Sequence, residues 1–117
     1  TCMSFGFKYG IVTDADLVFD VRCFPNPFYI PELKDKTGYD QEVKDYVFSN
    51  GEAKVFTDKV CDMLNYLIPL YIKEGKTQLT VAFGCTGGMH RSVAICNEIG
   101  EYLGKNYKTV IVHREIE

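Results

Sequence analysis

The sequence predicts an α/β fold: a mostly parallel sheet of about four strands with helices packed on it. Short apolar runs alternate along the chain with longer segments of helical periodicity, the pattern of parallel strands joined by right-handed crossovers. The 117 residues are 46% hydrophobic and 25% charged, which suits one ordered domain with an ordinary core and excludes wholesale disorder. We therefore expect residues 1–117 to form a single domain.

Two strands are expected early in the chain. Thr1–Phe7 alternates apolar residues with a glycine interruption and predicts a strand that ends near Lys8-Tyr9-Gly10. Asp16–Arg22 has an apolar run that is too continuous for a half-exposed edge strand. We therefore expect the second strand in the centre of the sheet, covered on both faces.

A long loop and two helices are expected next. Three prolines in Cys23–Pro31 prevent regular strand pairing, and the loop continues to Tyr39. A structureless stretch of this length in a small domain is usually functional or a lid. Asp40 is placed to cap a helix that stops at Asn50-Gly51, and apolar spacing predicts a longer helix over about Glu52–Lys73.

The last part of the chain completes the alternation. Leu79–Phe83 predicts a third, buried strand, and Gly84–Arg91 is a glycine-rich turn. Ser92–Leu103 has helical spacing, and Lys108–Val112 predicts the fourth strand.

Charge and cysteine content limit the possible functions. Thirteen Lys and Arg against sixteen Asp and Glu give a net charge of −3, which argues against broad phosphate neutralisation of nucleic acid but leaves a local basic patch open. The five cysteines are odd in number and form no CxxC pair, and only two histidines are present, so we expect no metal site. Most thiols are expected to be buried in a reduced, cytoplasmic protein with no membrane partner.

The strongest local signal lies between the third strand and its helix. A buried strand leads into a turn with three glycines, and a helix starts at once. Glycines let backbone N–H groups approach a ligand, and a helix N-terminus adds unpaired donors and a positive dipole end. The segment predicts a phosphate or sugar-phosphate site with the following residues: Cys85, Thr86, Gly87, Gly88, His90, Arg91 and Ser92. The simpler alternative is a turn that only packs the helix tightly.

A cysteine-dependent phosphatase is a second functional reading of the same segment. Cys85 is followed by five residues and then Arg91, as in the phosphate loop of such enzymes, where a thiolate attacks phosphorus and an Arg holds the oxygens. The chemistry also needs a general acid on a separate loop. The available carboxyl groups are Asp14, Asp16, Asp20 and Asp35.

Other residues are candidates for the rim of the site. Asp20 and Arg22 end the second strand, where the carboxylate would accept hydrogen bonds from sugar hydroxyls or an amine, or the two would simply pair. His113 and Arg114 follow the fourth strand and would either reach the same rim or form a solvated chain end. Phe28 lies in the proline-rich loop, where aromatic packing of the loop is the simpler reading.

The whole chain, from Thr1 to Glu117, resembles the C-terminal domain of the RapZ (YvcJ-like) family of RNase adapter proteins. The motifs that carry the resemblance occur in this order: Ser4-Phe5-Gly6-Phe7-Lys8-Tyr9-Gly10, Asp14-Ala15-Asp16, Phe19-Asp20-Val21-Arg22, Pro25-Asn26-Pro27, Thr37-Gly38, Gly84-Cys85-Thr86-Gly87-Gly88, His90-Arg91-Ser92 and His113-Arg114.

The resemblance implies a non-enzymatic regulatory domain without a cofactor of its own. In the family, a separate N-terminal P-loop domain binds and hydrolyses ATP or GTP; no GxxxxGK[ST] motif occurs in this chain. The C-terminal domain of some members binds glucosamine-6-phosphate and small RNA, delivers the RNA to a ribonuclease, and forms homo-oligomers. By motif, the implied sugar-phosphate pocket contains Asp20, Thr86, Gly87, His90 and Arg91, with Cys85 beside them.

Two positions depart from the family pattern. Many relatives have a pocket histidine after Pro25-Asn26-Pro27, where this chain has Phe28, which would alter the sugar preference. Many also continue past the His-Arg pair into a basic tail that contacts RNA, whereas this sequence reads Glu115-Ile116-Glu117.

Overall fold

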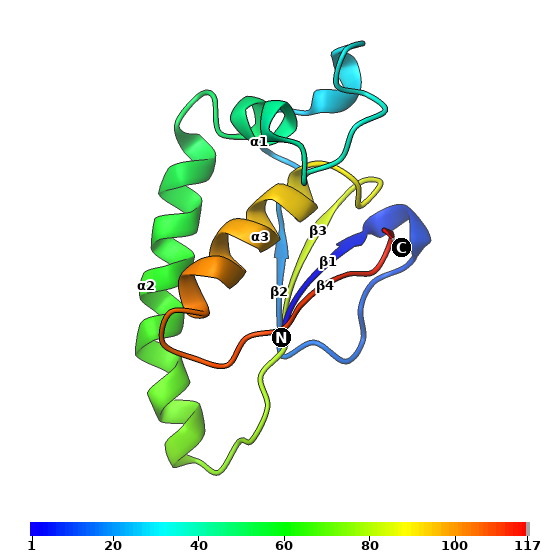
Figure 1. The fold of residues 1–117 in the computed structure, drawn as a ribbon. Coiled ribbons are helices and arrows are strands. Elements are labelled where there is room, and N and C mark those ends of the chain that lie inside the picture. Colours follow the sequence, from blue (N-terminus) through cyan, green and yellow to red (C-terminus); the bar gives the residue numbers. More distant parts are fainter. Residues whose placement is uncertain (117) are drawn as a thin grey trace.

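A computed structural model describes residues 1–116 and confirms the α/β prediction. Four strands form one sheet in the order β2-β3-β1-β4, and every neighbouring pair is parallel (Figure 1). The strands are β1 (Cys2–Gly6), β2 (Leu17–Asp20), β3 (Val81–Cys85) and β4 (Ile111–His113).

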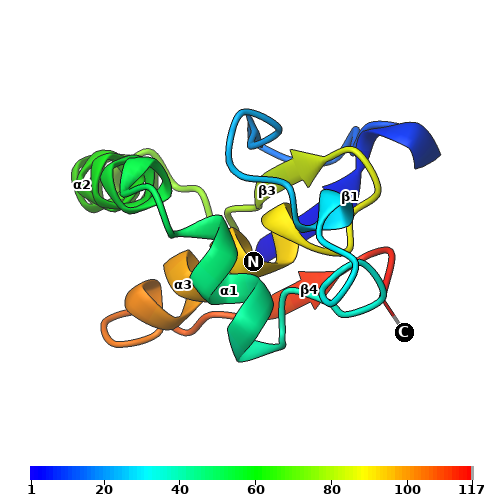
Figure 2. The same cartoon turned by 90° about the horizontal axis from the view of Figure 1, so that it is seen from above.

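Three helices lie on one side of this sheet (Figure 2). They are α1 (Gln41–Val47), α2 (Glu52–Lys73) and α3 (Arg91–Leu103). Helix α3 packs directly on β1 and β3, and α2 packs on α3. The crossovers from β2 to β3 and from β3 to β4 run in the same direction across the sheet, so right-handed connections place their helices on the same face.

The main core fills the space between the sheet and the helices. The parallel register aligns Cys2 with Val81, and both side chains are buried against the helices. Phe19 of β2 stacks on Phe83 of β3, and Phe56 of α2 meets the Phe83 ring edge-on.

The position of β2 corrects one expectation. The strand lies at the edge of the sheet, and Val18 is 46% exposed, so the prediction of a central strand covered on both faces was wrong. Leu17 and Phe19 pack towards the helices, whereas Val18 points to the opposite face. In this apolar run, therefore, one face of the strand packs on the core and the other is exposed.

Several element boundaries also differ from the expected ones. β3 runs to Cys85, so this residue ends the strand and does not lie in the turn. β1 ends at Gly6 and is followed by a 3₁₀ helix, η1 (Phe7–Tyr9), while η2 (Pro27–Tyr29) lies in the proline-rich loop. Asp40 precedes α1 as expected, but its carboxylate accepts a hydrogen bond from the Thr37 amide and not from the helix.

None of the helices among residues 1–116 combines the length and the apolar character that crossing a lipid bilayer requires.

Candidate functional site

A cleft of about 530 Å³ opens at the carboxyl ends of the strands, beside the start of α3. Ligands of open α/β sheets collect at this end of the strands. One wall is the turn after β3, and the other comes from the long loop that includes η2. The lining residues are Lys8, Tyr9, Asn26, Phe28, Tyr29, Lys34, Asp35, Lys36, Cys85, Thr86, Gly87, Met89, His90 and Arg91.

Glycine is needed in the turn because the backbone passes very close to β1. Gly88 has a φ of +76°, and a Cβ at this position would lie 2.6 Å from the backbone nitrogen of Gly6. A Cβ on Gly87 would meet nothing within 4 Å. Gly88 therefore shapes the turn, whereas Gly87 leaves open space in the cleft.

The turn also presents unused hydrogen-bond donors. Within residues 1–116, the backbone N–H groups of residues 87–90 donate to no protein acceptor. The first N–H groups of α3 follow directly, where a helix leaves its donors unpaired and carries a partial positive charge. This arrangement of free N–H donors at the start of a helix favours the binding of an anion.

Arg91 provides the positive charge beneath the turn. Its side chain is only 5% exposed. The guanidinium Nη1 donates to the backbone carbonyl oxygen of Arg22, and Nη2 lies 3.4 Å from Thr86 Oγ1. Nε is buried without a hydrogen-bond partner, and no salt bridge reaches Arg91 within residues 1–116. The charge of Arg91 helps to lower the pKa of the Asp20 carboxyl, but the two side chains form no direct ion pair. A buried charge without a direct ion pair is costly, so the site suits an anionic ligand.

Asp20 and Arg22 lie beside the cleft but do not line it. Asp20 is aligned with Gly84 of β3, as expected for neighbouring strands. Its carboxylate accepts bidentate hydrogen bonds from the Arg22 guanidinium. These bonds lower the pKa of the Asp20 carboxyl below its usual value. The Arg22 guanidinium in turn lies 4.1 Å from the centre of the Phe7 ring. The two side chains thus pair at the end of β2.

The long loop is fastened over the start of α3. His90 Nε2 donates to the carbonyl oxygen of Lys34 at 3.0 Å, and the Gly38 amide donates to the carbonyl oxygen of Met89 at 2.8 Å. A Cβ on Gly38 would lie 2.5 Å from the backbone nitrogen of Ala94, so the loop and the helix are in close contact. The loop that the sequence marked as functional therefore forms a wall of the cleft.

Cys85 lines the cleft, and the predicted site residues Ser92 and Gly88 do not. The side chains of Cys85 and Ser92 are both buried, and the Cys85 thiol donates to Ser92 Oγ at 3.1 Å.

His113 and Arg114 do not line the cleft, so the structure does not support the rim alternative. The His113 ring is 7% exposed, with Nδ1 2.6 Å from Ser4 Oγ and Nε2 2.8 Å from Asn97 Oδ1. Burial lowers the pKa of His113 below its ordinary value. Arg114 donates to the carbonyl oxygen of Gly10 at 2.6 Å.

Sequence reasoning missed most of the second wall. The residues that it did not place at the site are Lys8, Tyr9, Asn26, Tyr29, Lys34, Asp35, Lys36 and Met89. All but Met89 come from η1 and from the long loop of residues 23–39, where no helical or strand periodicity predicts which way each side chain points. The length of the loop was the available signal.

Metal binding has no structural support in the described part of the chain. Among residues 1–116, no group of three or more His, Cys, Asp or Glu side chains is gathered to hold an ion.

Comparison with known proteins places this chain in one family. The family model described as RapZ C-terminal domain matches residues 1–117. A nucleotide-binding protein of Clostridium botulinum is 63% identical over 117 residues, which cover 99% of this chain and 40% of the relative. Nucleotide-binding proteins of Clostridium beijerinckii and Geobacillus thermodenitrificans are 62% and 55% identical, over 40% and 39% of their lengths. This chain thus spans about two-fifths of the length of these relatives.

Proposed function

This chain belongs to the RapZ family, whose C-terminal domain it represents, and from this premise we propose that it is a regulatory domain that binds a sugar phosphate. The proposed ligand is of the glucosamine-6-phosphate type, and the site is the cleft at the start of α3. The observation that carries the proposal is the buried Arg91 guanidinium, which forms no salt bridge within residues 1–116 and has an unpartnered Nε.

The phosphate end of the ligand is assigned to the turn. A phosphate would accept hydrogen bonds from the free N–H groups of residues 87–90 and would neutralise Arg91. Lys8, Lys34 and Lys36 add positive charge around the cleft, although Lys36 is already paired with Glu42.

The sugar end is assigned to the opposite wall. Tyr9, Phe28 and Tyr29 are 61%, 50% and 76% exposed along the cleft and offer flat faces to a sugar ring. Asp35 is the one carboxylate among the lining residues, so it is the acceptor that we assign to an amino group or hydroxyls.

In a longer protein, this domain would act with other parts. The relatives are named nucleotide-binding proteins, and we assign ATP or GTP binding to the part of such a chain outside these 117 residues. We also propose, from family membership alone, a cytoplasmic homo-oligomer that contacts small RNA and a ribonuclease.

The test is titration calorimetry with glucosamine-6-phosphate, with glucosamine as the ligand that lacks phosphate. Only the phosphate ester should bind. Arg91→Ala should lose about 1.5–3 kcal/mol of affinity, the worth of charged hydrogen bonds. Arg114→Ala is the matched control, because Arg114 lies outside the cleft.

Arg91→Lys guards against misfolding, since it keeps the charge but loses the planar donor fork. Equal affinity of a folded Arg91→Ala protein and the wild type would remove Arg91 from the site, whereas reduced affinity of a folded Arg91→Lys protein would show that the planar donor fork is used. Absence of binding by the wild type to any sugar phosphate would reject the proposal.

A cysteine phosphatase is the second candidate, favoured by the contact of the Cys85 thiol with Ser92 Oγ and by Asp35 in the same cleft. In that reaction, Cys85 Sγ would attack phosphorus, Asp35 would protonate the leaving oxygen, and water would release phosphate from the cysteine. Hydrolysis of an aryl phosphate that disappears in Cys85→Ser would favour this function. Ligand binding that survives Cys85→Ser, without turnover in the wild type, would favour the regulatory domain.

A further inference from the structure

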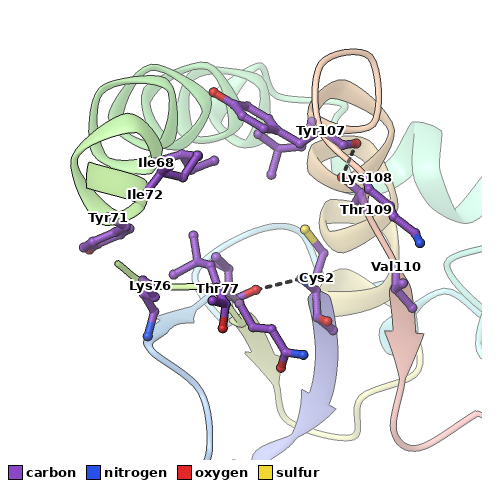
Figure 3. A pocket seen from close by; sticks show the side chains of 15 residues that line it. Cys2, Ile68, Tyr71, Ile72, Lys76, Thr77, Tyr107, Lys108, Thr109 and Val110 are labelled. Carbon is purple, nitrogen blue, oxygen red and sulfur yellow. Dashed lines mark hydrogen bonds between the residues drawn. The ribbon is translucent and has the colours of Figure 1, made fainter. Parts of the chain in front are cut away.

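A second hollow, of about 450 Å³, lies at the opposite end of the sheet from the proposed ligand site. Figure 3 shows the side chains that line it, from the last turns of α2, the start of β1 and two connecting segments. Most of the larger lining side chains are apolar or aromatic: Cys2, Ile68, Tyr71, Ile72, Leu79, Val81, Leu103, Tyr107 and Val110.

The helix beside this hollow carries more apolar surface than the domain covers. Residues 66–72 of α2 are seven consecutive apolar or aromatic residues, and the buried positions of the helix end at Leu64. Tyr66 is 70% exposed, Leu70 46% and Ile72 59%, and of these three residues Ile72 lines the hollow. A helix that is apolar on all sides is normally buried, so a covering partner is expected here.

The hollow lies where β1 enters the sheet. Thr1 is one of its lining residues, held by hydrogen bonds from its backbone nitrogen to the Leu79 carbonyl oxygen at 2.7 Å and from the Val81 amide to its own carbonyl oxygen at 2.9 Å. The matching family model is a C-terminal domain, and the matched part is about 40% of the relatives' length. In those relatives, the preceding polypeptide therefore arrives beside this hollow.

We propose that the hollow, with the exposed Ile72 side chain in its lining, is the docking surface for the part of a RapZ-family chain that precedes this domain. The docked segment would be apolar, to match the lining, with its polar groups near Lys108 at the edge. Lys76, also in the lining, is already paired with Asp16 at 2.7 Å. The proposal rests on family membership and not on the sugar-phosphate site, so the two are tested separately.

Thiol labelling provides the test. In this structure, Ile72 and Val55 lie on the same helix at 59% and 54% exposure, and Val55 is remote from the hollow. Ile72→Cys and Val55→Cys are therefore matched probes, made in a Cys23→Ser background because Cys23 is the exposed thiol of residues 1–116. Both are compared in the 117-residue chain and in the longest natural chain that contains it, with folding verified by circular dichroism.

In the longer chain, Ile72→Cys should react about tenfold more slowly than Val55→Cys, because a covered thiol is shielded from the reagent. In the 117-residue chain, the two rates should be similar. Similar rates in the longer chain would overturn the proposal. Slow labelling of Ile72→Cys in both chains would also overturn it, since a second copy of this domain would then be the cover.

Tyr71→Cys, at another lining position of the hollow, is the replacement probe if Ile72→Cys does not fold.

Discussion

His90 Nε2 lies 3.0 Å from the carbonyl oxygen of Lys34, and this hydrogen bond joins the two walls of the cleft. One partner begins α3, and the other belongs to the long loop that carries the aromatic side chains of the second wall. The Gly38 amide adds a second connection to the carbonyl oxygen of Met89. The shape of the site therefore depends on how firmly the loop is held to the helix.

Replacing His90 with Ala should loosen the loop. A neutral hydrogen bond contributes about 1 kcal/mol, so we expect the Gly38 amide to exchange about fivefold faster with solvent. His90→Gln, whose side-chain amide also donates, should restore part of the protection. Hydrogen exchange followed by mass spectrometry measures both. Unchanged exchange in His90→Ala would show that the loop is held by other contacts.

Gly87 and Gly88 should respond differently to Ala. Gly88→Ala should destabilise the fold by about 1–3 kcal/mol, because a Cβ would be forced into a positive-φ position 2.6 Å from the Gly6 nitrogen. Gly87→Ala should leave stability nearly unchanged and weaken sugar-phosphate binding, because its methyl group would extend into the cleft. Urea denaturation and calorimetry separate the two effects. Equal losses of stability would contradict this account of the turn.

The part of the site that the sequence predicted is the part built by local structure. A buried strand, a glycine turn and a helix are adjacent in the chain, so Thr86, His90 and Arg91 could be assigned to one place before the structure was known. Lys34 and Asp35 could not, because their position depends on how the loop packs on α3.

In the fold, too, local features were predictable from the sequence and long-range contacts were not. The strand and helix alternation fixed the class, but strand order depends on contacts between distant segments. β2 was expected in the centre because its run is apolar, yet it forms an edge where Val18 remains exposed. For His113 the sequence left a rim position or a solvated chain end open, but β4 pairs with β1 and buries the ring against Ser4.

Stability should fall as the pH drops below about 6.5, because of His113. Burial lowers its pKa in the folded state from the ordinary value of 6.5, so the unfolded chain binds more protons below that value. The stability that the neutral, buried His113 contributes is therefore fully present above pH 6.5. It is lost as the pH falls from 6.5 towards the lower pKa of the folded state. Lys76 and Arg22 lower the pKa values of Asp16 and Asp20. These two carboxyl groups therefore change the stability only when the pH falls below about their ordinary pKa of 3.8.

His113→Gln isolates this effect, since Gln can still donate to Asn97 and accept from Ser4 without titrating. Urea denaturation of both proteins at several pH values between 5 and 8 provides the measurement. The variant should lose most of the slope between pH 6.5 and 5. An equal slope in both proteins would assign the acid sensitivity to other groups.

Phe28→His should make ligand binding more sensitive to pH. Phe28 lines the cleft at 50% exposure, and Lys34 Nζ lies 4.8 Å from the centre of its ring. An imidazole there gains a positive charge as the pH falls through about 6.5, which would attract the phosphate ester by about 0.5–1 kcal/mol at this exposed position. Calorimetry at pH 7.5 and 5.5 measures the change in affinity for the sugar phosphate. On lowering the pH, the affinity of Phe28→His should rise about twofold to fivefold more than that of the wild type, and this comparison with the wild type corrects for protonation of the phosphate itself.

Tyr29→His is the matched control. Tyr29 lines the same cleft at 76% exposure, so its histidine variant should gain less affinity because water screens the charge more. An equal gain in both variants would indicate a general charge effect and would remove Phe28 from contact with the ligand.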